Sequence, residues 1–233
     1  MIMKLIFLDI DNTLLDFDKY TEESLKNGFK HFSLPEFEPY MLDVFHRVND
    51  KLWRQIEEGT LNIDGLRHVR FQNFFEALHM KTSFDPTLFE AYYRSRLYES
   101  AISVKGAYEM LEYLSKKYIL ATASNGPYEQ QMHRLSLAKM DRYFTYFFIS
   151  EKIGVSKPSP LFFSKAFEEI NANRSEIILS KDACIIGDSL TSDMKGGLNV
   201  GMHTCFFNKK GIDNLPKEID FVLSDLSKIS DVL

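Results

Sequence analysis

Two pairs of aspartates, widely separated in this sequence, come after short apolar runs. Asp9 and Asp11 follow the first run, and Asp188 and Asp193 follow a later one. Lys157, in a Lys-Pro dipeptide, adds a candidate cation. Carboxylates can ligate a hard cation, attack an electrophilic centre, or transfer a proton. These residue types are therefore suited to metal-assisted nucleophilic chemistry.

The charge of this set narrows the chemistry further. If they share one cleft, the four carboxylates and Lys157 carry a formal charge of -3. Two like charges ~4 Å apart repel by about 4 kcal/mol at an effective dielectric constant of ~20, so the cluster must take up a proton or a multivalent cation. Oxygen ligands favour Mg2+, which brings the charge to -1, and one protonated Asp brings it to zero. A phosphate group can then approach, so we expect Mg2+ as cofactor and a small phosphorylated metabolite as substrate.

Each short motif also has an ordinary structural interpretation. The segment 9–13 is compatible with a polar turn, and Ser124-Asn125-Gly126-Pro127 with another. Lys157 alone is compatible with a surface lysine, and Asp188 with a helix cap. Their occurrence together, each at the end of a predicted strand, favours a common site.

Short apolar runs recur along the chain, as is typical of buried parallel strands. They lie at 4–8, 118–123, 147–149, 183–186, 203–207 and 220–223. Helical patterns alternate with the later runs, at 107–117, 128–138, 160–170 and 191–199. This alternation predicts an α/β fold with a doubly wound parallel sheet. Because parallel strands place their carboxyl ends at one edge, the polar residues should meet there.

The segment 17–100 differs from the rest of the chain, because it shows helical spacing and no convincing strand. We expect about four helices, one of which begins at Asp85-Pro86, and packing of Phe45, Phe71, Phe74 and Phe75 between them. The predicted domains are a discontinuous core, 1–16 and 101–233, and an inserted all-helical cap, 17–100.

Composition excludes several classes of partner. The 233 residues include 28 basic and 33 acidic side chains, a formal charge of -5, which argues against binding a nucleic acid polymer. The sequence contains no run of ~18 apolar residues, the length that would predict a membrane span. The first residues lack an export signal, and Cys184 and Cys205 lie in apolar stretches as buried thiols would. We therefore expect a cytoplasmic protein.

The four polar segments, in this order, resemble the signature motifs of the haloacid dehalogenase (HAD) superfamily, with the helical insert where its cap belongs. The resemblance spans nearly the whole chain and implies a Rossmann-like core. It further implies that Asp9 attacks phosphorus and carries the phosphoryl group, while Asp11 serves as general acid and then general base. An acid at position 11 resembles the phosphatases of the superfamily and not its dehalogenases or ion pumps.

The same resemblance implies roles for the other residues. Ser124, Asn125 and Lys157 would hold the phosphate. Mg2+ would be bound by the carboxylates of Asp9 and Asp188 and by the backbone carbonyl of Asp11. The remaining acid, Asp193, would orient the water shell of the metal or Lys157.

Within the superfamily, the stretches 14–17, 124–126 and 149–158 are most similar to the capped pyrimidine 5'-nucleotidases. The resemblance therefore implies a Mg2+-dependent phosphomonoester hydrolase acting on nucleoside 5'-monophosphates or another small phosphorylated metabolite. Three alternatives stay open: a phosphosugar mutase, a phosphoglycolate-type phosphatase, and a non-catalytic HAD-like binding module.

Overall fold

The computed structural model describes residues 3–233, so the first two residues of the predicted core lie outside the described part. The chain divides into two compact units, one formed by the chain up to Asp16 together with Ala101–Leu233, and the other by Phe17–Ser100. Among the described residues, no helix combines the length and apolarity needed to cross a bilayer.

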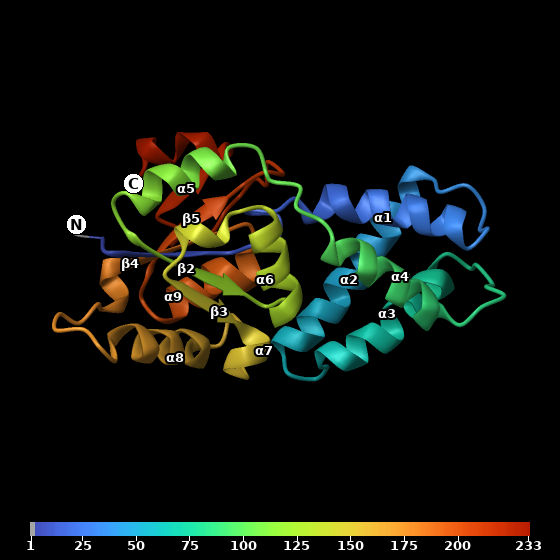
Figure 1. The fold of residues 1–233 in the computed structure, drawn as a ribbon, viewed down its shortest axis with the longest axis horizontal. Coiled ribbons are helices and arrows are strands. Elements are labelled where there is room, and N and C mark those ends of the chain that lie inside the picture. The colour runs from blue at the N-terminus through green and yellow to red at the C-terminus, as the bar shows by residue number, and fades with distance from the viewer. Residues whose placement is uncertain (1–2) are drawn as a thin grey trace. The chain divides into compact units, whose positions relative to one another are not determined.

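The discontinuous unit is built on one sheet. Within residues 3–233, six strands pair in parallel in the order β3-β2-β1-β4-β5-β6 (Figure 1). They are β1 (Leu5–Leu8), β2 (Ile119–Ser124), β3 (Tyr146–Ile149), β4 (Ala183–Gly187), β5 (His203–Phe207) and β6 (Phe221–Leu223). The chain order reverses beside β1, which is where open sheets of this kind bind ligands. The predicted α/β fold class is confirmed.

Alternate residues of β1 enter two separate cores, because successive strand side chains point to opposite faces. Ile6 and Leu8 pack with apolar residues of α5 (Ala107–Ser115) and α6 (Tyr128–Leu137). Leu5 and Phe7 pack with those of α8 (Pro160–Asn171) on the other face. Figure 1 shows α5 and α8 on opposite sides of the sheet. Burial on both faces explains why β1 is continuously apolar.

The segment after β4 differs from the helix predicted over 191–199. Leu190–Met194 form a π-helical turn, and a short helix, α9 (Lys195–Asn199), follows. The wider turn accompanies a hydrogen bond from the Ser189 N–H to Oδ2 of Asp193, 3.1 Å long. Short π-helical segments frequently mark functional sites. Short turns complete this unit: α7 (Ser150–Ile153) and the 3-10 turns Asp141–Tyr143, Ser180–Asp182 and Leu226–Asp231.

The second unit, residues 17–100, contains four helices among its described residues: α1 (Phe17–His31), α2 (Pro39–Glu57), α3 (Ile63–Ala77) and α4 (Pro86–Tyr98). As predicted, Asp85 caps the start of α4, and its side chain accepts the Thr87 N–H at 2.9 Å. The predicted aromatic packing is also confirmed, since Phe45, Phe71, Phe74 and Phe75 are all buried.

A buried ion pair lies inside this helical unit. Arg70 donates from Nε and Nη2 to the two oxygens of Glu90, at 3.0 and 2.6 Å. Its guanidinium carbon also lies 4.8 Å from the ring centroid of Tyr93. Both charged residues are less than 5% exposed. The pair therefore joins α3 to α4 without contact with bulk water.

Candidate active site

The loop after β1 separates two acidic side chains that are close in sequence. The Asp9 N–H donates to the carbonyl of Ile186 at 3.0 Å, so Asp9 continues the sheet ladder toward β4. The chain then turns, with the Asn12 N–H donating to the carbonyl of Leu15 at 2.7 Å. Asn12 adopts a φ of 61°, a left-handed conformation that Asn tolerates better than most residues. Asp9 thus stays at the sheet edge while Asp11 leaves it.

Lys157 lies between two carboxylates in the sheet edge. Its Nζ donates to Oδ1 of Asp9 at 2.9 Å, to Oδ1 of Asp193 at 2.5 Å, and to the carbonyl of Ala123. These bonds use all three hydrogens of the ammonium group. Lys157 and Asp193 are each only 1% exposed. Burial alone would lower the pKa of Lys157, but Asp193 and Asp9 outweigh it and raise that pKa above its usual value.

Asn125 holds the backbone of this lysine in place. Its Nδ2 donates to the Lys157 carbonyl at 2.9 Å, and its Oδ1 accepts the Lys157 N–H at the same distance. The second hydrogen of Nδ2 points to Oγ of Ser192, 3.3 Å away. The side-chain amide of Asn125 is therefore fully used within the protein. Its predicted contact with phosphate stays a prediction, and the backbone N–H is the group that could make it.

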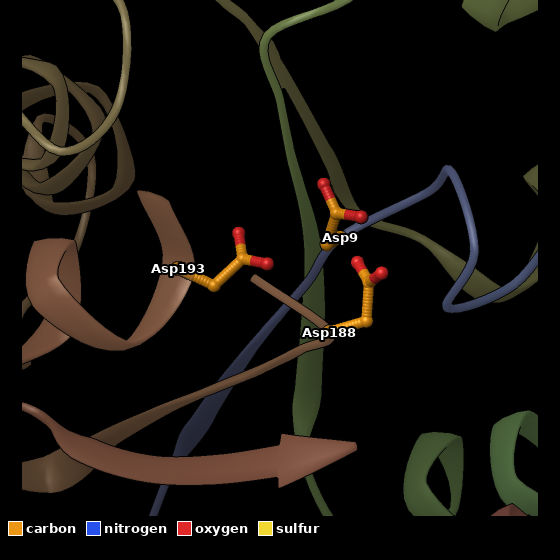
Figure 2. A group of neighbouring side chains, drawn as sticks. All are labelled: Asp9, Asp188 and Asp193. Carbon is orange, nitrogen blue, oxygen red and sulfur yellow. The ribbon is translucent and has the colours of Figure 1, made fainter. Parts of the chain in front are cut away.

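Three carboxylates from two segments of the chain converge beside Lys157. Oxygen atoms of Asp9, Asp188 and Asp193 lie within 4.8 Å of one another, and Figure 2 shows the three side chains directed into a common space. An all-oxygen donor set suits a hard divalent cation such as Mg2+. Burial, opposed by the Lys157 ammonium and assisted by the Asp193 charge, raises the pKa of Asp9 to about 7. This crowding of negative charge is the condition that a bound cation relieves.

Asp193 uses both of its oxygens inside the protein. Oδ1 accepts from Lys157, and Oδ2 accepts from the Ser189 N–H. This geometry fits an orienting role better than direct metal ligation, which leaves Asp9 and Asp188 as the carboxylates best placed to hold a cation.

The carboxylate of Asp11 faces α6. Oδ1 accepts from Nη1 of Arg134 at 2.6 Å, and Oδ2 accepts from Nε2 of Gln131 at 2.7 Å. Sequence analysis missed both partners, which lie three residues apart on the helix after Ser124. The available signal was their spacing, since a polar pair at i and i+3 occupies one helix face.

Ser124 is the last residue of β2, and its hydroxyl is also held by α6. Its Oγ accepts from the Gly126 N–H at 3.1 Å and from Nε2 of Gln131 at 2.9 Å. A serine hydroxyl has two acceptor positions and one hydrogen. With both acceptor positions used, the hydrogen is left to donate to an incoming acceptor such as a phosphate oxygen.

The observed charge balance differs from the predicted one because Arg134 joins the site. Four carboxylates with Lys157 and Arg134 carry a formal charge of -2, and a divalent cation would neutralise it. The predicted balance, which reached zero with Mg2+ and one protonated Asp, did not include this buried guanidinium. The structure otherwise brings the predicted residues at the ends of β1, β2 and β4, together with Lys157, to one edge of the sheet.

Comparisons with known proteins agree with this arrangement. A family profile described as haloacid dehalogenase-like hydrolase matches residues 5–207. The chain is 31% identical to the pyrimidine 5'-nucleotidase PynA of Streptococcus pneumoniae, over 92% of this chain and 87% of that protein. It is 29% identical to the pyrimidine 5'-nucleotidase YjjG of Escherichia coli, over 87% of this chain and 85% of that one.

A solved structure is similar to this chain over its full length. The magnesium-bound crystal structure of the HAD-hydrolase YfnB from Bacillus subtilis, which shows interdomain movement, is similar with a TM-score of 0.88 and 27% identity. The similarity covers 100% of this chain and 99% of that one. Because the family profile spans most of the sequence, the chain belongs to the haloacid dehalogenase-like hydrolases.

Proposed function

We propose that this protein is a Mg2+-dependent phosphomonoesterase that acts through a phosphorylated Asp9. One observation carries the proposal: the Asp9 carboxylate is held at the end of β1 by Lys157, 2.9 Å away, with Asp188 beside it. A carboxylate attacks phosphorus efficiently only when it is aligned and its repulsion from phosphate is relieved. The fixed lysine provides the alignment and part of the relief.

The reaction follows from the positions of the two loop aspartates. An oxygen of Asp9 forms a bond to phosphorus as the bond from phosphorus to the ester oxygen breaks. Asp11, which takes up a proton from water as the anionic phosphate enters the site, gives that proton to the departing alkoxide. In the second step Asp11 takes a proton from water, whose oxygen attacks phosphorus and frees Asp9 and inorganic phosphate.

The remaining residues hold the phosphoryl group and the cation. The Ser124 hydroxyl donates to a phosphate oxygen, and Lys157 offsets negative charge at the same centre. The carboxylates of Asp9 and Asp188, with the Asp11 carbonyl, would hold Mg2+, while Asp193 orients Lys157. When bound, Mg2+ supplies charge that stabilises the phosphoryl oxygens during transfer.

Two further parts of the proposal rest on the relatives. Both PynA and YjjG are named pyrimidine 5'-nucleotidases, which favours pyrimidine nucleoside monophosphates among small phosphorylated substrates. The discontinuous unit would be the catalytic core, and residues 17–100 the cap. The interdomain movement of YfnB supports a cap that closes and excludes water from the reaction.

The test is phosphate release from a panel of substrates, with Mg2+ and then with excess EDTA. The panel contains pyrimidine and purine 5'-monophosphates, sugar phosphates, phosphoglycolate and p-nitrophenyl phosphate. We expect Mg2+-dependent release, highest with pyrimidine monophosphates. A flat profile would contradict the nucleotide preference, and isomerised sugar phosphate with little free phosphate would indicate a mutase.

The same panel is run on Asp9→Asn, for which we expect activity at least about 10³-fold below that of the wild type. Asp213→Asn, which changes an exposed loop aspartate in the same way, is the matched control and should retain activity. Near-native hydrolysis by Asp9→Asn would overturn the assignment of the nucleophile. A wild-type chain inactive on the whole panel would overturn the proposed function.

A further inference from the structure

We propose that Gln131 and Arg134 are positioning residues for the reaction, which hold the general acid Asp11 and turn the Ser124 hydroxyl toward the substrate. The inference rests on the proposed phosphomonoesterase function. It concerns residues of α6 that belong to none of the four sequence motifs.

The two side chains occupy one face of α6 and are buried, with Gln131 0% and Arg134 1% exposed. They bond to each other, since Nη1 of Arg134 donates to Oε1 of Gln131 at 3.0 Å. Each also donates a hydrogen bond to the Asp11 carboxylate: Arg134 to Oδ1 at 2.6 Å, and Gln131 to Oδ2 at 2.7 Å. Asp11 is thus held at both oxygens by two rigid donors on a single helix turn.

The direction of every hydrogen bond in this group is fixed by Arg134. A guanidinium has donors only, so Oε1 of Gln131 must accept and the amide nitrogen of Gln131 must donate. That nitrogen has two hydrogens, and its two acceptors are Oδ2 of Asp11 and Oγ of Ser124. Ser124 therefore receives a hydrogen bond from α6 and has to donate its own hydrogen elsewhere. One buried cation sets the orientation of two site residues.

The exposure of Asp11 shows why such a hold is needed. Its side chain is 31% exposed, whereas that of its partner Arg134 is 1% exposed. A partly exposed aspartate at a loop has several rotamers open to it, and water competes for its oxygens. A general acid must lie within hydrogen-bond reach of the leaving oxygen, so fixing one rotamer raises the fraction of productive encounters.

Leaving groups of different basicity separate this role from simple structural support. An alkyl ester, such as the preferred nucleotide of the panel, needs a proton on its leaving oxygen, whereas p-nitrophenolate leaves readily without one. The value of kcat/KM covers the steps up to formation of phosphorylated Asp9. For Arg134→Met, which keeps an unbranched stem, we expect kcat/KM to fall about 10²-fold with the alkyl ester and less than about 10-fold with p-nitrophenyl phosphate.

Further variants complete the test. Arg134→Lys keeps a donor toward Asp11 and should recover at least about 10-fold of the lost alkyl-ester activity. In an Asp11→Asn background, Arg134→Met should change kcat/KM for the alkyl ester by less than about 10-fold, since the acid that it positions is gone and only its effect on Ser124 remains. Gln131→Met should raise KM for both substrates by releasing Ser124, and it tests the inference independently if Arg134→Met fails to fold.

Equal losses with both leaving groups, or full additivity with Asp11→Asn, would overturn this inference while leaving the phosphomonoesterase function intact. An unchanged KM in folded Gln131→Met would overturn the part that concerns Ser124. A wild-type chain without phosphatase activity would overturn the proposed function and this inference together.

Discussion

The carboxylate of Asp193 lies directly over Gly187, the last residue of β4. A Cβ atom placed on Gly187 would lie 2.2 Å from Oδ2 of Asp193 and 2.3 Å from its Cγ. Only glycine leaves room for Asp193 to reach Lys157 from the π-helical turn. The bond between Asp193 and Lys157 thus depends on the absence of a side chain at position 187.

Gly187→Ala should therefore displace Asp193 and lower activity. We expect a destabilisation of about 1–3 kcal/mol, the usual cost of overpacking. Mg2+-dependent phosphatase activity should fall by more than the loss of folded protein explains. Urea unfolding and a p-nitrophenyl phosphate assay measure the two effects. Gly211→Ala is the control: at a φ of 65° the added Cβ strains the backbone but meets no neighbouring side chain, so it should lower stability and leave activity unchanged. Wild-type activity in Gly187→Ala would show that the position of Asp193 is not required.

Removal of the Lys157 ammonium should strongly destabilise the core. In Lys157→Met, the carboxylates of Asp9 and Asp193 lose their shared buried cation, and breaking a buried pair typically costs about 3–5 kcal/mol. Urea unfolding without metal measures the loss. The double variant Lys157→Met/Asp193→Asn should recover part of it, because it removes one of the unpaired charges.

Lys116→Met serves as the surface control for this experiment. Lys116 pairs with Glu112 at 3.0 Å, but both side chains are more than 60% exposed. Solvent screens such a pair, so its loss should leave the unfolding curve unchanged. If Lys157→Met also unfolded at the urea concentration of the wild type, the buried lysine would not compensate the charge of the two carboxylates.

Mg2+ should stabilise the folded protein, and Asp188 should be required for this effect. A ligand that binds only the native state adds about 2.7 kcal/mol at one hundred times its Kd. Thermal unfolding with increasing Mg2+ should therefore raise the Tm of the wild type, and EDTA should reverse the rise. Asp188→Asn should abolish most of the shift, since it removes a charged oxygen ligand. An unchanged shift in that variant would place the cation elsewhere.

The buried Arg70–Glu90 pair predicts a separate effect in the helical unit. Arg70→Met should destabilise this unit by about 3–5 kcal/mol, because Glu90 would remain buried without its cation. The double variant Arg70→Met/Glu90→Leu should be closer to the wild type, since it leaves no unpaired charge. Circular dichroism during chemical unfolding measures both. Equal destabilisation in the single and double variants would show that packing, not charge pairing, dominates here.

The secondary-structure elements were largely predictable because local sequence carries their physics. Residues 5–8 are apolar at every position because β1 is buried on both faces, and Asp85-Pro86 starts α4 through capping and a fixed φ. The short helix α7 and the 3-10 turns were not predicted, and the helix predicted around Asp193 differs from the structure. There a π-helical turn replaces α-helix, because the Asp193 carboxylate bonds back to the Ser189 N–H and across to Lys157.

The sequence by itself determined which residues stand at the carboxyl ends of the strands, since strand period and parallel topology place those ends at one edge. Only the tertiary structure decided how they pair. Asp9 meets Lys157 across 148 positions of chain, and Asp11 meets Arg134 across 123. Such contacts depend on side-chain direction and on the packing of α6 against the sheet, neither of which hydrophobic patterning records. The buried guanidinium that sets the charge and the hydrogen-bond directions of the site was for this reason found only in the fold.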